Sequence, residues 1–452
     1  MESGEEPAAR SRMAPEATAE GGVCSGMDRK ATEWSTLSAE IAECLAEPVV
    51  QDSIQLCGAA LLQILASTPD KVLELARGKL YASPYHDVPV QWRRLYEEAT
   101  LHKVVRLLQA ATDDSDDCLQ EIVEVLDNGI AMSGCPSRRA MFEDIFRQLQ
   151  QLVPEETDER QWKAYGLCKP DFTPSKGSGI DRVKAVSFTT FQSWISGGNP
   201  TPRILEDIIS HWPARKLWSQ PGYILRQTLG GRRTVQVELG ESYVTEGWSQ
   251  RTMPMRDFMT QYLLAEKPER IGYLAQYDLF AQIPALRNDI GIPDYCFTET
   301  SPPTDAYAME TLGLDSTQKL DEPIVNVWLG PKGTKSPLHT DPYHNILCQV
   351  VGYKYVRLYP PSETPNLYPR GKDDHGIEMR NTSQVDVAAF QYITRYPSCG
   401  EARALRETYP RFEGAKFVEA LLAPGESLYV PLGWWHYVES RSTSISVNFW
   451  WN

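Results

Sequence analysis

The chain has 452 residues, a formal net charge of −15 and a pI near 5.1, so it is long enough for two or three domains with a large core. The acidic balance excludes a general basic surface for wrapping nucleic acid, and no direct nucleic-acid binding is expected. No run of about 18 apolar residues is present, so a membrane-spanning protein is excluded as well. The nine cysteines have no zinc-ligand spacing and fit thiols that stay reduced inside a cell.

The N-terminal stretch, residues 1–31, is rich in Glu, Ala, Gly, Ser and Pro and has no apolar core. This composition predicts a disordered tail and excludes a signal peptide. No convincing nuclear import signal is present, so we expect an intracellular protein in the nucleus, the cytoplasm or both.

Residues 32–153 carry apolar residues at helical spacing and are predicted to form an all-α domain. Gly129 follows one helical pattern and is expected to end that helix. Two stripes are interpreted as core rather than as a partner groove: Trp92, Leu95, Tyr96 and Ala99, and Phe142, Ile145, Phe146 and Leu149.

Residues 154–182 lack periodicity and are expected to be a linker or a wrapping segment. From residue 183 to 452 short strand-like runs alternate polar and apolar residues, which is typical of a sandwich or small barrel. We therefore predict an α+β protein whose second half is a cupin-like double-stranded β-helix, or jelly roll. The predicted strands are 223–225, 234–239, 324–328, 355–359, 427–430 and 444–449.

One motif, residues 336–345, has the pattern of half a metal site. In an extended strand, His339 and Asp341 point to the same face and offer an imidazole and a carboxylate side by side. About one such His-x-Asp/Glu triplet is expected by chance from 7 His and 60 acidic residues, so its position before an apolar strand carries the argument. With His436, in a second strand-like setting, the set becomes the two-His, one-carboxylate triad that binds non-haem Fe(II).

Further motifs resemble those of the JmjC-domain oxygenases over roughly residues 183–452. They are Trp212-Pro213-Ala214, the run 233–240, Tyr243, Trp248-Ser249-Gln250, the run 272–276, the run 292–296, the metal strand and the closing Phe449-Trp450-Trp451. The resemblance implies an enzyme that uses Fe(II), 2-oxoglutarate and O2 and releases succinate and CO2. Asp341 as the acidic ligand, where many JmjC histone demethylases have Glu, favours the hydroxylase side of the family.

Carried over by motif, the resemblance assigns three groups of residues. The catalytic iron ligands would be His339, Asp341 and His436. The co-substrate would be held by Tyr273, Ser336, Asn345 and Lys354. The substrate pocket would contain Glu238, Trp248, Trp328 and Trp450, an acidic and aromatic set that suits a guanidinium or another cation.

Some positions stay open at this stage. From the residues alone, Lys354 is equally compatible with a solvent-facing strand position, because Gly352 and Tyr353 indicate a turn before it. His344 is off the ligand alternation and is expected near the ligands or at the surface. The segments 300–322 and 371–414 are longer than expected for the family, which leaves the substrate open because loops at a barrel mouth set what enters.

The predicted function is hydroxylation of a protein or peptide substrate, with arginine as the first choice. Demethylation of histone methyl-lysine by the same iron chemistry is the second. A non-catalytic cupin-like interaction protein is the third, although retention of Lys354 as a co-substrate anchor argues against it. The oligomeric state is left open.

Overall fold

The computed structural model describes residues 26–452 except 85–86, 112–115, 154–164, 166, 246, 301–316, 373–375, 377 and 399. Residues 1–25 of the predicted tail and most of the first half of the predicted linker, 154–164 and 166, lie outside the described residues. So do residues 301–316 of the first long segment. No described helix is both long enough and apolar enough to cross a membrane.

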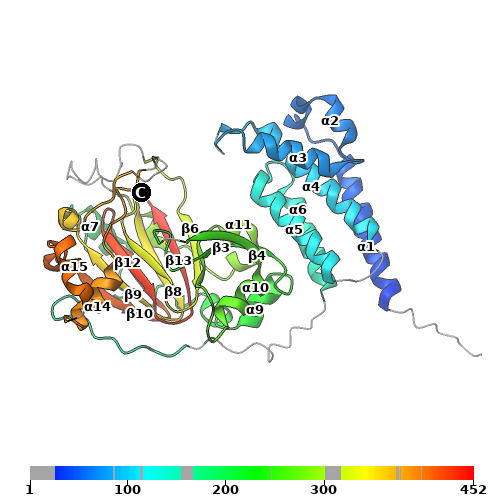
Figure 1. The fold of residues 1–452 in the computed structure, drawn as a ribbon. Helices are drawn as coiled ribbons and strands as arrows, with labels where there is room; N and C mark the ends of the chain where they lie inside the picture. Colours follow the sequence, from blue (N-terminus) through cyan, green and yellow to red (C-terminus); the bar gives the residue numbers. More distant parts are fainter. Residues whose placement is uncertain are drawn as a thin grey trace, which may run out of the picture.

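The N-terminal region is helical and lies to one side of the sheets (Figure 1). Its first helix begins at Gly26, inside the stretch expected to be a tail. Both predicted apolar stripes lie on helices, and the four residues of the second are all buried. The helices are α1 (Gly26–Ala46), α2 (Ala59–Ile64), α3 (Pro69–Leu80), α4 (Val90–Ala110), α5 (Asp116–Ser133) and α6 (Arg139–Leu152).

The prediction that Gly129 ends a helix is wrong, because it lies inside α5. A Cβ at this position would be 2.6 Å from Thr100 Cγ2 and 2.9 Å from Phe142 Cε1. Thr100 belongs to α4 and Phe142 to α6, so the glycine allows both helices to approach α5 closely. A glycine inside a helical pattern here has a packing role.

Two sheets, almost entirely antiparallel, form the second half of the described chain (Figure 1). The larger has the strand order β1-β2-β11-β8-β13-β6-β5-β3-β4 and the smaller β10-β9-β12-β7. This is the predicted α+β architecture with a cupin-like sandwich. The strands are β1 (Arg182–Lys184), β2 (Arg203–Glu206), β3 (Thr234–Leu239), β4 (Ser249–Pro254), β5 (Gly272–Tyr277), β6 (Ile324–Gly330), β7 (Lys335–His339), β8 (His344–Val351), β9 (Lys354–Tyr359), β10 (Val418–Leu422), β11 (Glu426–Val430), β12 (Trp435–Ser440) and β13 (Ser444–Trp451).

Helices cover the outer faces of both sheets. α14 and α15 contribute Phe390 and Ala402 to a core with Leu338 and Tyr437 of the smaller sheet. The helices between β1 and β6 pack against the larger sheet in a second core. These helices are α7 (Phe188–Ser196), α8 (Ala214–Leu217), α9 (Pro221–Gln227), α10 (Met255–Phe258), α11 (Leu279–Gln282) and α12 (Pro284–Arg287), with α14 (Val387–Arg395) and α15 (Gly400–Thr408) on the other side.

Five of the six predicted strands are present, and the one expected at 223–225 is a helix. Pro221 occupies the first turn of α9, where its missing N–H costs no hydrogen bond. Pro221, Ile224 and Leu225 are buried together, which is the three-and-four spacing of a helix face. Three apolar residues are too short a window to distinguish this pattern from a strand.

The helical region contacts the larger sheet through α5 and α6. Asp127 of α5 forms a buried ion pair with Arg233, just before β3, with a nitrogen–oxygen distance of 2.7 Å. The Arg233 guanidinium also lies 3.6 Å from the ring centroid of Phe146 on α6. The described end of the predicted linker runs along β10, where Ser175 donates two hydrogen bonds to Glu419.

Candidate active site

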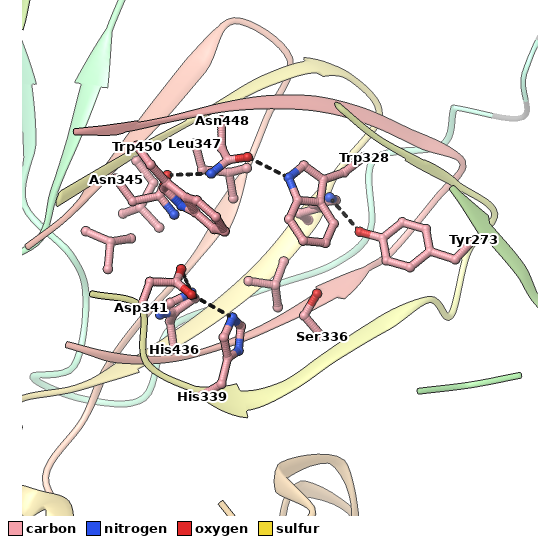
Figure 2. Close-up of a pocket in the computed structure, with 14 residues that line it drawn as sticks. Tyr273, Trp328, Ser336, His339, Asp341, Asn345, Leu347, His436, Asn448 and Trp450 are labelled. Carbon is pink, nitrogen blue, oxygen red and sulfur yellow. Dashed lines mark hydrogen bonds and ion pairs between the residues drawn. The ribbon is translucent and has the colours of Figure 1, made fainter. Parts of the chain in front are cut away.

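Three side chains of residue types that ligate metal ions converge between the two sheets (Figure 2). His339 ends β7, and His436 on the neighbouring β12 is its direct cross-strand partner. The two imidazole centroids are therefore 4.2 Å apart. Asp341 lies two residues beyond His339, just past the end of β7 rather than within a strand as expected. The potential ligand atoms of all three residues lie within 4.8 Å of one another.

Backbone carbonyls orient both imidazoles. Nδ1 of His339 is 2.7 Å from the carbonyl oxygen of Pro337, and Nδ1 of His436 is 3.1 Å from that of Trp434. A carbonyl only accepts, so each Nδ1 carries the hydrogen and each Nε2 keeps its lone pair. The two Nε2 atoms lie 3.8 and 3.4 Å from the carboxylate oxygens of Asp341. Hydrogen bonds of this kind fix the ring orientation of histidines that ligate metals.

The protonation states also suit a metal. Burial, with a smaller contribution from the nearby His436, lowers the pKa of His339 to about 4, so its imidazole is neutral at physiological pH. Burial alone would raise the pKa of Asp341, but its contacts with His436 and His339 lower it below the usual value. Metal ligation requires neutral imidazoles and an ionised carboxylate. His339 and Asp341 therefore need no deprotonation before a divalent cation binds.

A buried ammonium lies deeper in the same pocket. Lys354 begins β9, and only 2% of its surface is exposed, so the solvent-facing alternative is wrong. Its Nζ is 3.4 Å from Tyr273 Oη and makes no ion pair within the described part of the chain. Burial lowers the pKa of Lys354 to about 7. Because an unpaired buried charge is costly, this ammonium points to an anionic ligand.

Hydroxyl and amide groups complete the lining around Lys354. Ser336 lies on β7 and Tyr273 on β5, and both line the pocket together with the three metal-ligating residues. Asn345 on β8 lines it as well. The four residues expected to hold the co-substrate are thus brought together around one cavity.

The four residues expected to form the substrate pocket divide into two pairs. Trp328 and Trp450 line the cavity (Figure 2). Glu238 and Trp248 are not among its lining residues but contact each other, with Trp248 Nε1 donating to Glu238 Oε2 at 3.3 Å. Glu238 lies beside the cavity, because it is the cross-strand partner of Tyr273.

Glu238 is a half-buried carboxylate that has no cationic partner among the residues that the structure describes. Burial raises its pKa, against the hydrogen bond from Trp248, which lowers it. Tyr243 lies near both Glu238 and Asp341: burial raises the pKa of its hydroxyl, and these two carboxylates add to the rise. Glu238 and Asp341 are therefore both near enough to Tyr243 to influence its hydroxyl group.

Comparison with known proteins agrees with this geometry. The family model described as a cupin-like domain matches residues 190–452. Lysine-specific demethylase 8 of Xenopus tropicalis is 32% identical over 467 aligned positions, covering 92% of this chain and 95% of that protein. Jumonji C domain-containing protein 5 of Drosophila melanogaster is 34% identical, covering 82% of this chain and 83% of its own length. This chain belongs to the JmjC family of 2-oxoglutarate oxygenases.

A more distant JmjC relative is named for a different activity. The human bifunctional peptidase and (3S)-lysyl hydroxylase JMJD7 is 26% identical over 58% of this chain and 80% of its own length. Relatives named as demethylase and as hydroxylase therefore both match this chain, and the family by itself leaves the reaction outcome open.

The residues present fit the cofactors that JmjC proteins typically use. Two imidazole nitrogens and one carboxylate on one side of a cavity are the donor set of non-haem Fe(II) sites with open positions. The unpaired ammonium of Lys354 fits the distal carboxylate of 2-oxoglutarate, with the hydroxyl groups of Tyr273 and Ser336 nearby.

Sequence reasoning missed two polar or aromatic members of this site. Asn448 lines the cavity from β13, and Tyr343 stacks on Trp450 with a centroid distance of 5.6 Å. Asn448 could have been found by alternation, because it lies two residues before Trp450 on the same strand. The apolar lining residues Leu347, Leu428, Val430 and Val438 were also missed.

His344 is buried and is not at the surface, which was one of its two predicted locations. Its Nδ1 lies 3.0 Å from Tyr429 Oη and 3.4 Å from the backbone nitrogen of Leu432. Because Leu432 belongs to the turn that precedes β12, His344 supports the segment leading to His436.

Proposed function

We propose that this chain is an Fe(II)- and 2-oxoglutarate-dependent dioxygenase that hydroxylates an arginine side chain in a protein or peptide. The iron ligands in this proposal are His339, Asp341 and His436. Lys354, Tyr273, Ser336 and Asn345 hold 2-oxoglutarate, and Glu238, Trp248, Trp328 and Trp450 receive the substrate. The convergence of the three ligands beside an unpaired buried ammonium supports the oxygenase part of the proposal.

Bound Fe(II), with 2-oxoglutarate and O2, supplies the oxidation of a C–H bond and releases succinate and CO2. The chain contributes binding and orientation. Lys354 neutralises one carboxylate and donates hydrogen bonds, while Tyr273 and Ser336 offer hydroxyl donors to the same group. The apolar side chains of Leu347, Leu428 and Val438 limit the access of water to the cavity.

Glu238 is the observation that carries the choice of arginine. Its carboxylate has no cationic partner among the described residues, and burial raises its pKa. A guanidinium offers a planar fork of hydrogen-bond donors to a carboxylate and stacks on aromatic rings. This site has both a carboxylate, on Glu238, and aromatic rings, on the tryptophans. Binding such a cation would remove the cost of the half-buried, unpaired carboxylate.

The second candidate function is demethylation of methyl-lysine on histones. The name of the Xenopus tropicalis relative, lysine-specific demethylase 8, supports it, and a relative from Danio rerio has the same name. The iron chemistry is identical until the carbon is hydroxylated: a side-chain methylene gives a stable product, whereas a hydroxylated N-methyl group collapses and is lost. A mono- or dimethylammonium would also pair with Glu238.

A non-catalytic interaction protein is the weakest candidate. Such a protein would have no need to keep the ammonium of Lys354 buried and unpaired, because that arrangement costs stability without a ligand.

The deciding experiment uses mass spectrometry on a pool of arginine peptides and methyl-lysine peptides. The purified protein is incubated with Fe(II), ascorbate and 2-oxoglutarate in air, with His339→Ala as the inactive control. A gain of one oxygen on arginine is the expected result. Loss of a methyl group from lysine would show instead that the protein is a demethylase. Absence of both succinate and modified peptide would overturn the oxygenase proposal.

A matched pair of variants tests the role of Glu238. Glu238→Gln is expected to lose arginine hydroxylation while still converting some 2-oxoglutarate to succinate without substrate. Glu241→Gln is the control, because Glu241 is exposed on the loop after β3 and pairs with Lys335. Equal arginine hydroxylation by both variants would exclude Glu238 as the substrate carboxylate.

The domain division remains part of the proposal: a tail at 1–31, a helical domain at 32–153, a linker at 154–182 and the oxygenase domain at 183–452. The start of α1 at Gly26 moves the first of these boundaries toward the N-terminus. A nuclear or cytoplasmic location and the absence of direct nucleic-acid binding also remain predictions.

A further inference from the structure

Three polar side chains on neighbouring strands form a chain of hydrogen bonds along the cavity wall (Figure 2). Trp328 of β6 donates from Nε1 to Asn448 Oδ1 on β13, at 2.8 Å. Asn448 Nδ2 then donates to Asn345 Oδ1 on β8, at 3.2 Å. All three residues line the cavity, and β13 lies between β6 and β8 in the larger sheet.

The direction of this chain follows from the chemistry of its first member. An indole N–H can only donate, so the group of Asn448 that faces Trp328 must be its carbonyl oxygen. The amide NH2 of Asn448 must then face Asn345, and Asn345 must present its own carbonyl oxygen in return. Asn448 is 1% exposed and Asn345 6% exposed, so bulk water does not compete for these bonds.

The orientation of Asn345 leaves its amide NH2 available. Within the described part of the chain, Nδ2 of Asn345 has no protein partner, while the residue itself lines the cavity that contains Lys354 and the metal-ligating side chains. A donor left unpaired in this position suits an anionic oxygen of a ligand.

We propose that Asn448 is a positioning residue that holds the Asn345 amide with its NH2 group toward the co-substrate. The Trp328 indole fixes the orientation of Asn448, and we call this arrangement the lock. The inference rests on the proposed function, in which 2-oxoglutarate occupies the cavity. If Asn345 turned over, its carbonyl oxygen would face a carboxylate, and an attraction would become a repulsion. The lock makes that reversal unfavourable, so the site is organised before the ligand arrives.

The experiment measures 2-oxoglutarate binding to the Mn(II)-loaded full-length chain by isothermal titration calorimetry, alongside KM and kcat for 2-oxoglutarate. Asn448→Leu removes both hydrogen bonds at similar volume and is expected to weaken binding about three- to tenfold. Asn448→Asp accepts hydrogen bonds from both neighbours, which reverses Asn345, and is expected to weaken binding at least about tenfold. In both variants KM rises, whereas kcat at saturating 2-oxoglutarate stays within about threefold.

Two controls separate the lock from other effects. Asn326→Leu alters another buried asparagine, the cross-strand partner of Asn448 on β6, which does not line the cavity, and it should leave binding unchanged. Asn448→Asp is also combined with Asn345→Ala. If Asn448→Asp acts through Asn345, it should weaken 2-oxoglutarate binding little further once Asn345 is alanine. If the aspartate charge repels 2-oxoglutarate directly, the full loss of affinity should persist in the Asn345→Ala variant.

The outcomes are distinct. Weaker binding by the Asn448 variants that disappears in the Asn345→Ala background supports the lock. Unchanged binding, an effect fully additive with Asn345→Ala, or an equal loss in Asn326→Leu overturns it. Failure of the unmodified protein to bind 2-oxoglutarate would instead overturn the proposed function itself. Should Asn448→Leu fail to fold, Asn448→Asp retains the volume and the hydrogen bonds and still gives the answer.

Discussion

Two groups of buried charges, one in each half of the molecule, are built on opposite principles. In the helical region, Arg94 is 1% exposed and pairs with Asp52, Glu97 and Glu98. Arg138 adds a further ion pair with Glu98. Between the two sheets, Lys354 is 2% exposed and has only the hydroxyl of Tyr273 as a polar contact among the described residues.

The difference separates charges that hold the fold from charges that await a ligand. When a buried cation is surrounded by carboxylates, their attraction offsets the free-energy cost of removing the charges from water. Removal of one partner leaves the remaining buried charges uncompensated. A buried cation without a carboxylate weakens the empty protein and points to an anion that binds there. Perturbed ionisation in a cavity is evidence of function for this reason, whereas burial of charge alone is not.

Among the variants that test this difference, Arg94→Met is expected to have the largest effect, on the stability of the protein. The variant leaves the carboxylates of Asp52, Glu97 and Glu98 buried without their shared cation, so the free energy of unfolding should fall by about 3–5 kcal/mol. Urea denaturation followed by circular dichroism measures the change. A loss below about 1 kcal/mol would mean that the cluster is not a structural unit.

Lys354→Met is the counterpart in the second group. It removes a buried charge that has no carboxylate partner among the described residues, so the stability of the ligand-free protein should be unchanged or increased. Binding of 2-oxoglutarate should weaken by about 2–5 kcal/mol, at least about thirtyfold, because the distal carboxylate loses its cation. Calorimetry on the Mn(II)-loaded protein gives the affinity, and undiminished binding would refute the anchoring role.

The pH dependence of 2-oxoglutarate binding sharpens the comparison further. Burial lowers the pKa of Lys354 to about 7, and only its protonated form pairs with a carboxylate. Below pH 7 the group is already charged, so its contribution does not change with pH. Above pH 7 a proton must be taken up, and Kd should rise by up to about tenfold per pH unit.

Titrations between pH 6 and 9, in buffers of different ionisation enthalpy, reveal that proton uptake. The Lys354→Met variant should lack the slope. A slope that persists in the variant would assign the titration to another group.

The smallest effect is expected from an ion pair that belongs to neither buried group. Arg403 and Glu407 on α15 form a pair whose side chains are 87% and 65% exposed. Arg403→Ala should change the free energy of unfolding by no more than about 0.5 kcal/mol and leave 2-oxoglutarate binding unaltered. A larger loss would show that exposure is a poor guide to the weight of a charge in this protein.

Much of the site was predictable because its side chains follow local rules. His339 and Asp341 are two residues apart next to a strand, and alternation brings such residues to one face. The same rule applied backwards from Trp450 would have found Asn448, which was overlooked. The prediction that Lys354 anchors the co-substrate came from the family resemblance, because the neighbouring residues in the sequence are equally compatible with a surface position.

Errors in the prediction occurred where tertiary contacts override local signals. Gly129 has the sequence of a helix stop, but the close approach of α4 and α6 to α5 requires it within the helix. The run at 223–225 is apolar and short, and only its burial with Pro221 distinguishes a helix from a strand. Neither contact can be read from neighbouring residues.

The sequence by itself determined the helical stripes, five of the six predicted strands and the residue types of the candidate metal site, because these depend on local periodicity and on ligand chemistry. Only the tertiary structure decided that His436 stands opposite His339, that Lys354 is buried with no carboxylate partner among the described residues, and that hydrogen bonds link Trp328 to Asn345 through Asn448. Those features depend on the register between strands that are distant in the chain, and register is fixed by the packing of the whole sandwich.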